Sequence, residues 1–315
     1  MTGSAGVAQP IPGELNEQVR LLDGRRLHLV CAGQGAPTVL LEGGFGATSR
    51  AWWKVQPAVA QTTRVCAYDR AGAGRSDPGP LPRDARAIAE DLSNALRRAG
   101  ISGPFVVVGH SSGGLYVRAF SDLRRAEVAG MVLLDPSVEH QDRRFAEVFG
   151  PGAGSLEGLR SRTARCEAAA RARQIPSSDP TLAVCTPHKA GSSSGPDEAL
   201  LAAQRPETWA TQISELDNLW GATSDEVAAG RKSYGDMPLV VLTAEKTYAG
   251  VPALVRPAAD ALWRRLHAEI AAKSTRGRTE IVSGSSHLIM IDRPDAVAAA
   301  IVEVVKEVRR ERAPR

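Results

Sequence analysis

A serine hydroxyl in the segment GHSSG, residues 109–113, is the group in this chain best suited to nucleophilic chemistry. The apolar run at residues 105–108 precedes it, and residues 114–120 have the composition of a helix. A Gly-x-Ser-x-Gly segment between a strand and a helix is typical of a nucleophile elbow, a turn too tight for bulky neighbours. The pattern therefore predicts that Ser111 is a nucleophile, whereas the competing interpretation is a glycine- and serine-rich turn without chemistry.

Such a serine needs a general base, because its alkoxide is too costly to form unaided near neutral pH. His287 follows the last predicted strand in the sequence GSSH, and we expect it to lie at the same sheet edge as Ser111 and to be the base. The other five histidines are better explained by their surroundings: His28 in an early strand, His110 in the elbow, His267 in the middle of a helix, and His140 and His188 in a polar central region where they at best contact a substrate.

Two carboxylates compete to be the acid that orients this histidine. Asp135 ends the apolar run at residues 133–134, and a buried carboxylate at a strand end needs a partner, which His287 would provide. Glu245 follows the apolar run at residues 240–244, but Lys246 beside it suits a surface ion pair. We favour Asp135 and keep Glu245 as the alternative.

An oxyanion that develops during acyl transfer needs two N–H donors. The amide of Ser112, which follows the nucleophile, is expected to be one of them. By resemblance to the serine hydrolases of the α/β-hydrolase superfamily, the segment GGFG at residues 43–46 is expected to supply the other, from Phe45 in the first place and from Gly44 in the second. The loop DRAGAG at residues 69–74 resembles a loop of the same superfamily that is mainly structural, so we assign it no chemistry.

Strand-like and helix-like segments alternate along most of the chain. This alternation indicates βαβ units and a parallel sheet whose carboxyl edge would bring the candidate residues together. A hairpin is expected at residues 19–30, strands at 38–41, 64–68, 105–108, 129–134, 239–243 and 279–282, and helices at 51–60, 84–99, 258–273 and 295–310.

Taken together, these motifs resemble the serine hydrolases of the α/β-hydrolase superfamily, over about residues 19–308 and most weakly over 137–236. The resemblance implies an α/β fold with a mostly parallel eight-stranded sheet, helices on both faces, and a triad in the chain order of serine first and histidine last. The chain departs from the family pattern at two places. No aspartate follows the seventh strand, where the acid usually lies, and Glu42 stands before Gly43 where the family more often has His-Gly.

The region at residues 137–236 interrupts the alternation with short helical segments and Pro/Ser/Gly-rich links. We interpret it as a helical cap inserted after the sixth strand, over the active site. Residues 1–136 and 237–315 then form the hydrolase core.

The four cysteines fall into two kinds. Cys166 and Cys185 lie in the polar insertion, where a disulfide would stabilise a region with little core, and we expect them to be linked. Cys31 and Cys66 lie inside predicted strands, and we expect them to be buried free thiols. The expected disulfide favours an exported protein, periplasmic or secreted, over a cytoplasmic one, although residues 1–9 show no leader pattern.

Composition and motifs indicate which classes of partner the chain is expected to bind. The chain has 315 residues, 43% of them apolar, and a net charge of +4. It shows no concentrated basic stripe for nucleic acid and no apolar run of about 18 residues for a membrane span. It also shows no ligand spacing for a metal and no nucleotide-binding loop, so we expect no metal and no cofactor. The expected partner is a small ester-like substrate, and the oligomeric state stays open.

The function that these residues favour is hydrolysis of carboxylic esters through an acyl-serine intermediate. Amidase or peptidase, lactonase and thioesterase activities use the same triad and stay open, as does a non-catalytic binding protein of the same fold. Members of the superfamily with epoxide hydrolase or haloalkane dehalogenase chemistry have aspartate at the elbow, so Ser111 argues against those activities.

Overall fold

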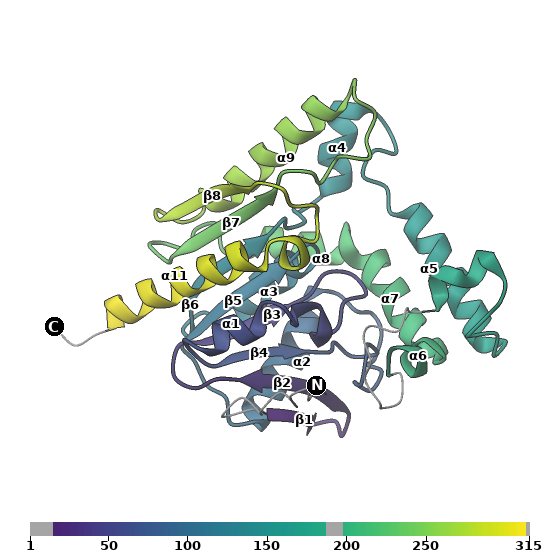
Figure 1. Ribbon diagram of the computed structural model, residues 1–315, viewed down its shortest axis with the longest axis horizontal. Helices are drawn as coiled ribbons and strands as arrows, with labels where there is room; N and C mark the ends of the chain where they lie inside the picture. The colour runs from purple at the N-terminus through teal and green to yellow at the C-terminus, as the bar shows by residue number, and fades with distance from the viewer. Residues whose placement is uncertain (1–14, 187–197, 313–315) are drawn as a thin grey trace, which may run out of the picture.

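The centre of the molecule is an eight-stranded sheet with strand order β1-β2-β4-β3-β5-β6-β7-β8 (Figure 1). The computed structural model describes residues 15–186 and 198–312. β1 pairs with β2, and β2 with β4, in antiparallel fashion, and the remaining neighbours are parallel. The predicted mostly parallel eight-stranded sheet is thus confirmed. The strands are β1 Leu15–Arg20, β2 Arg26–Ala32, β3 Thr38–Glu42, β4 Val65–Tyr68, β5 Phe105–His110, β6 Val128–Leu134, β7 Leu239–Ala244 and β8 Gly277–Val282.

Helices cover both faces of this sheet, as predicted. Side chains alternate between the two faces of a strand, so the central strands are apolar at nearly every position. Phe105 and Val107 pack with one set of helices, whereas Val106 and Val108 pack with the other. The first face carries α2 Ala85–Arg98, α3 Gly113–Leu123 and α9 Arg256–Ala271, and the second carries α1 Gln56–Ala60, α10 Ile289–Asp292 and α11 Pro294–Arg312.

Residues 137–236, which we call the insertion, form helices joined by turns and loops in their described part. Figure 1 shows α5, α6 and α7 grouped at one side of the sheet, with α4 beside α9. α8 packs instead against α2 and α3, through an apolar cluster that includes Ile88, Tyr116 and Val227. The elements are α4 Gln141–Phe149, α5 Glu157–Arg171, η2 Pro180–Cys185, α6 Glu198–Ala203, α7 Pro206–Leu219 and α8 Ala222–Ala229. His188 lies outside the described residues.

Two disulfides are present, one predicted and one not. Cys166 of α5 is linked to Cys185 of η2, which confirms the predicted pair. Cys31 and Cys66 are also linked, so the expectation of free thiols is wrong. They lie directly opposite one another where β2 pairs with β4. The sequence shows that both residues are in strands, but not that those two strands are neighbours.

The predicted helix at residues 51–60 is also different in the structure. It consists of a 3-10 turn, η1 Ser49–Trp52, followed by the short α1. Pro57 lies in the first turn of α1. Since proline lacks an N–H and its ring excludes the preceding helical turn, a helix can begin there but cannot pass through.

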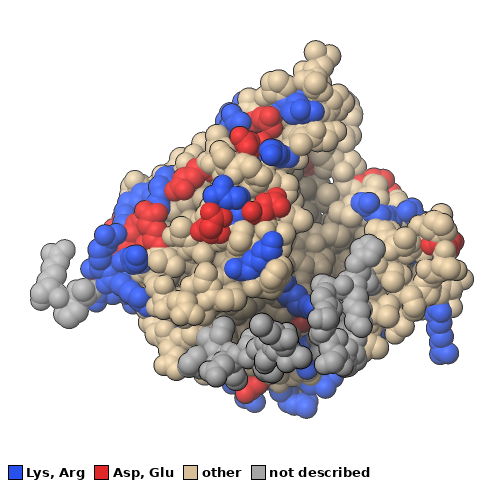
Figure 2. All heavy atoms as spheres, in the orientation of Figure 1, with Lys and Arg blue, Asp and Glu red and all other residues tan. Residues whose placement is uncertain are grey.

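The surface carries charges of both signs. Figure 2 shows acidic and basic side chains next to one another over much of one face of the molecule, with broad uncharged areas between them. None of the helices within the described residues is both long and apolar enough to cross a membrane.

Candidate active site

Ser111 lies at the turn between β5 and α3, in a backbone conformation that favours glycine, with a φ of 54°. Its amide donates to the Leu134 carbonyl at 3.1 Å, and its own carbonyl accepts from Gly114 at 2.9 Å. A Cβ on Gly113 would lie 2.6 Å from the carbonyl oxygens of Glu42 and Gly43, so only glycine fits there. Strained backbone of this kind is characteristic of functional sites, and here it presents the serine at the sheet edge.

The structure brings Asp135 and His287 together. Asp135 follows β6, its side chain is fully buried, and its Oδ2 lies 2.7 Å from Nδ1 of His287, whose side chain is 40% exposed. Thr247 Oγ1 donates to the same oxygen at 2.5 Å, and Oδ1 accepts from the Trp263 indole at 2.8 Å and from the Ala244 amide at 3.1 Å. The carboxylate therefore accepts from four donors.

These contacts keep Asp135 ionised. Burial acts to raise the pKa of this carboxyl, but the hydrogen bond and charge of His287, with smaller effects of His267 and Thr247, hold the pKa below its usual value. An ionised acid can orient the histidine and stabilise its protonated form.

Glu245, the alternative acid, has a different partner. Its Oε2 accepts from the Gly284 amide at 2.7 Å, in an exposed position on the loop that follows β7. The histidine hydrogen bond thus goes to Asp135, and the geometry favours the first of the two candidates.

His110 contacts both the backbone and the ring of His287. Its Nε2 donates to the backbone carbonyl of His287 at 2.8 Å, and the centroids of the two rings are 4.7 Å apart. Burial, with a smaller effect of His287, lowers the pKa of His110 to about 4, so the ring is neutral at pH 7. A neutral His110 holds the His287 backbone without placing a second positive charge beside the imidazole.

The segment at residues 43–46, which we call the oxyanion loop, faces the elbow. Phe45 and Ser112 line the same cavity as Ser111 and His287. Among the described residues, neither the Phe45 nor the Ser112 amide donates to a backbone carbonyl. Gly44 lies close as well, since a Cβ there would be 3.0 Å from Cβ of Ser111. The arrangement suits a pair of N–H donors for an oxyanion.

The cavity above Ser111 has a volume of about 360 Å³. Apolar side chains from the insertion form much of its wall, and polar side chains complete the lining. The insertion contributes Leu156, Leu159, Leu216, Leu219 and Trp220, and the polar lining includes Ser137, Gln141, Thr247 and Tyr248.

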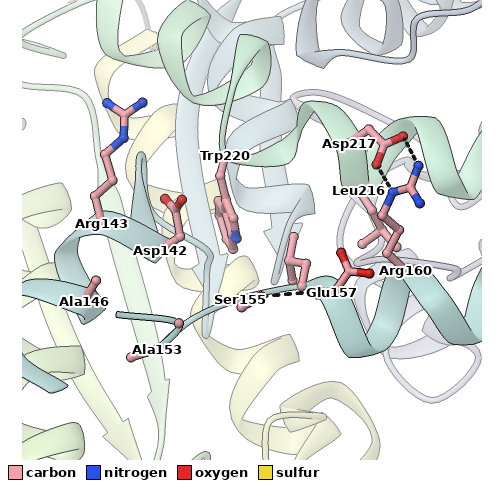
Figure 3. Close-up of a pocket in the computed structure, with 12 residues that line it drawn as sticks. Asp142, Arg143, Ala146, Ala153, Ser155, Glu157, Arg160, Leu216, Asp217 and Trp220 are labelled. Carbon is pink, nitrogen blue, oxygen red and sulfur yellow. Dashed lines mark hydrogen bonds and ion pairs between the residues drawn. The ribbon is translucent and has the colours of Figure 1, made fainter. Parts of the chain in front are cut away.

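A second hollow of about 410 Å³ adjoins this cavity (Figure 3). The two share Leu156, Leu216 and Trp220. The Trp220 indole donates to the Gly154 carbonyl at 3.2 Å, which holds the ring between them. Charged residues line the outer hollow: Asp142, Arg143, Glu157, Arg160 and Asp217.

Sequence reasoning missed two residues that bind the Asp135 carboxylate. Trp263 lies on the buried face of α9, where its apolar surroundings indicate only core packing. Thr247 lies two residues after Glu245, in the loop that follows β7. The hydroxyl of Thr247 had no distinguishing signal in the sequence.

His267, expected to be an ordinary helix residue, is fully buried and close enough to Asp135 to feel its charge. Its Nδ1 accepts from Thr243 Oγ1 at 2.6 Å, and its Nε2 donates to the Pro136 carbonyl at 3.1 Å. Burial lowers the pKa of His267 to about 4, although the charge of Asp135 acts against this shift. His267 is therefore neutral in the folded protein, like His110.

This burial predicts a loss of stability in acid. A histidine of the unfolded chain titrates near pH 6.5, so between about pH 6.5 and 4 the unfolded state binds more protons than the folded state. Stability then falls as the pH falls through this window, by on the order of 3 kcal/mol for each such histidine. We expect the slope of unfolding free energy against pH, measured by urea denaturation, to be clearly smaller in His267→Gln than in the parent. Equal slopes would show that His267 does not contribute.

Comparison with known proteins agrees with this architecture. The sequence model of the family described as "Alpha/beta hydrolase family" matches residues 39–300. Lipase LipV of Mycobacterium tuberculosis is 34% identical over 144 residues, which cover 45% of this chain and 54% of the lipase. The soluble epoxide hydrolase of a Corynebacterium species is 32% identical over 122 residues, which cover 39% of this chain and 42% of that enzyme. The chain thus spans about half or less of the length of these curated relatives.

A solved structure of a thermophilic esterase from Thermogutta terrifontis has a TM-score of 0.59 at 20% identity, and the match covers 94% of this chain and 98% of the esterase. A likeness at this identity shows the fold alone. The family match, in contrast, extends over most of the chain and includes both the elbow and His287. This protein therefore belongs to the alpha/beta hydrolase family.

Proposed function

We propose that this protein is a serine hydrolase that cleaves carboxylic esters through an acyl intermediate on Ser111. The observation that carries the proposal is the hydrogen bond between His287 Nδ1 and the fully buried carboxylate of Asp135, in a cavity that Ser111 also lines. A histidine oriented in this way leaves Nε2 available to accept the serine proton.

The reaction follows from these positions. His287 accepts the proton of Ser111 as Oγ attacks the ester carbonyl, and the amides of Phe45 and Ser112 stabilise the oxyanion that forms. His287 then protonates the leaving alcohol. The same histidine then deprotonates a water molecule, whose oxygen attacks the acyl carbonyl. The bond to Ser111 Oγ breaks, the histidine returns the proton to Oγ, and the carboxylic acid product leaves. Asp135 stays ionised throughout and stabilises the imidazolium.

The proposal includes a role for the insertion, residues 137–236, as a cap over the site. Its support is the lining of the cavity, in which Leu156, Leu216 and Trp220 come from the insertion and Ser111 and His287 from the core. A largely apolar lining with a few polar side chains suits an ester with an apolar acyl or alcohol group.

Other functions are less well supported. One relative is named as an epoxide hydrolase. Epoxide hydrolase chemistry on this fold uses an aspartate at the elbow, where this chain has Ser111. Amidases, lactonases and thioesterases share the triad, and substrate tests must separate them. A purely non-catalytic binding protein has no need for an ionised acid bound to a histidine next to a strained serine.

The test is covalent labelling followed by a substrate panel. A fluorophosphonate probe is expected to label the protein at Ser111, as mapped by peptide mass spectrometry. p-Nitrophenyl esters of increasing chain length are expected to be hydrolysed, and the matching p-nitroanilides much more slowly. An absence of labelling, or labelling at another serine, would contradict the proposal. Faster turnover of the anilides would make the protein an amidase on the same triad.

A further inference from the structure

The guanidinium of Arg70 lies buried behind the oxyanion loop with all five of its N–H donors in use. Nη1 donates to the Gly43 carbonyl at 2.8 Å and to Glu42 Oε1 at 2.6 Å. Nη2 donates to the Gly44 carbonyl at 2.8 Å. The remaining donors, on Nε and Nη2, bind the two carboxylate oxygens of Glu215, each at 3.0 Å.

The two carbonyls that Arg70 binds belong to the peptide units that carry the candidate oxyanion donors. The Gly44 carbonyl shares a peptide unit with the Phe45 amide, and the Gly43 carbonyl shares one with the Gly44 amide. In a trans peptide the C=O and N–H groups point in opposite directions. Arg70 therefore holds the edge of each unit opposite its N–H, whichever of the two amides serves the oxyanion.

We propose that Arg70 is a positioning residue for the oxyanion hole, and that Glu215 of α7 holds it in place. Two effects follow from the geometry. The guanidinium fixes the planes of both peptide units, and its positive charge on their carbonyls makes their N–H groups stronger donors. The inference rests on the proposed function, since it concerns the oxyanion of acyl transfer.

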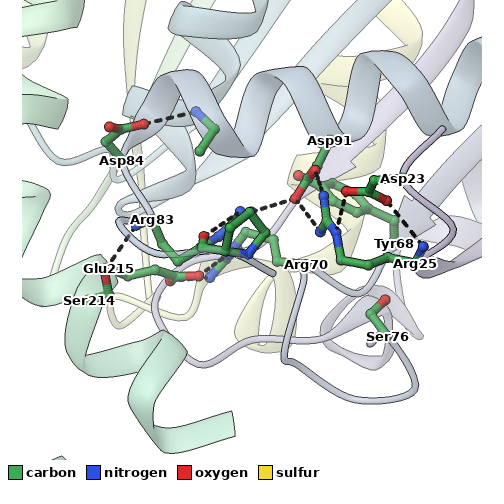
Figure 4. Close-up of polar contacts among 12 residues, drawn as sticks. Asp23, Arg25, Tyr68, Arg70, Ser76, Arg83, Asp84, Asp91, Ser214 and Glu215 are labelled. Atoms are coloured by element: carbon green, nitrogen blue, oxygen red, sulfur yellow. Dashed lines mark hydrogen bonds and ion pairs between the residues drawn. The ribbon is translucent and has the colours of Figure 1, made fainter. Parts of the chain in front are cut away.

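The surroundings of Arg70 fix its orientation. Glu215 binds it in a bidentate manner from the insertion (Figure 4), Glu42 binds it from the end of β3, and its guanidinium lies 5.2 Å from the centre of the Tyr116 ring. Glu42 also accepts from the Tyr68 hydroxyl. A planar fork with five donors matches these acceptors, and a lysine ammonium with three does not.

Glu215 makes the oxyanion loop dependent on the insertion. It is a buried residue of α7, and its pairing with Arg70 joins that helix to the loop at residues 43–46 through a single guanidinium. The loop at residues 69–74, expected to be structural only, thus supplies the residue that links the two.

The first experiment compares Glu215→Gln with the parent. Infrared difference spectra of the acyl-enzyme, trapped with an isotope-labelled carbonyl, report donation to the acyl oxygen. We expect the carbonyl stretch to move to higher frequency in the variant, because the donors are weaker and less well placed. The acylation rate is expected to fall about 10- to 100-fold, with little change in KM. This decrease is no larger than the decrease in rate that follows removal of one oxyanion donor.

Glu207→Gln is the matched control. Glu207 is an exposed acid in the first turn of the same helix. This variant is expected to keep the parent's carbonyl frequency and acylation rate. A shift equal to that of Glu215→Gln would trace the effect to the charge of α7 and would overturn the inference.

Arg70→Lys tests the other side of the pair and is expected to shift the stretch further in the same direction. If that variant does not fold, as judged by circular dichroism, Glu215→Gln decides alone. A folded Glu215→Gln protein whose acyl carbonyl stretch is unchanged would overturn the role of this pair and leave the proposed function intact. A parent protein that forms no acyl-Ser111 would overturn both.

Discussion

Replacement of Ser111 by alanine is expected to lower kcat for ester hydrolysis by about 10⁴- to 10⁶-fold, because the variant has no atom to form the acyl intermediate. The loss is large but finite. A cavity with two N–H donors still stabilises the oxyanion of direct attack by water, and that residual effect keeps the rate above the uncatalysed one. Steady-state kinetics with a p-nitrophenyl ester measures the loss, and the fluorophosphonate probe is expected not to label the variant.

The fold is expected to survive this change. Alanine has the same backbone preferences as serine to a first approximation, so the positive φ at position 111 is neither relieved nor made much worse. A melting curve by circular dichroism checks this point. Ser233→Ala, at an exposed serine before β7, is the control and is expected to keep full activity. A folded Ser111→Ala protein with activity within tenfold of the parent would exclude the acyl-serine mechanism.

The elbow, the apolar strands beside it and Asp135 could be predicted from the sequence, because their conformation or burial depends mainly on neighbouring residues. The glycines around Ser111 could be predicted as a tight turn because neighbouring groups leave no room for a Cβ. The apolar strands that flank it could be predicted because both faces of each strand are covered. Asp135 was favoured because a carboxylate at the end of a buried strand needs a donor, and the structure provides four.

Contacts between distant segments could not be predicted in this way. Cys31 and Cys66 face one another only because β2 lies beside β4. Arg70 and Glu215 are 145 residues apart, and the charge of each alone indicates a solvated side chain. Trp263 binds the acid through one indole N–H, which an apolar helix face does not reveal. These residues hold the candidate site in position, and single-sequence patterns carry little information about such support.

The identity of the acid gives the second large expected effect. Asp135→Asn is expected to lower kcat by about 10²- to 10⁴-fold, since a neutral amide does not stabilise the His287 imidazolium and can hold the imidazole in the wrong tautomer. The four donors around the carboxylate are expected to make this loss of kcat larger. The amide has one acceptor oxygen, so its NH₂ group must face either the Trp263 and Ala244 donors or the Thr247 and His287 donors.

Because Asp135 also binds Trp263 and Thr247, its replacement is expected to lower stability as well as activity. The pKa of Asp135 is depressed in the folded protein, so its contribution to stability is present above the unfolded pKa, near 3.9, and is lost as the pH falls through the folded pKa. Kinetics of Asp135→Asn are therefore to be measured near neutral pH and well below its melting temperature. The loss of kcat then reports the chemistry rather than the unfolded fraction.

Glu245→Gln is the matched comparison and is expected to change kcat little. A glutamine at this position still accepts from the Gly284 amide, and the carboxylate it replaces is exposed and has no bond to His287. The order of the two losses decides the assignment, because both variants exchange a carboxylate for its amide on neighbouring strand ends. A severe loss in Glu245→Gln with a mild one in Asp135→Asn would place the acid after β7, as in most of the family. Asp135 would then serve only to join the end of β6 to α9 and the loop after β7.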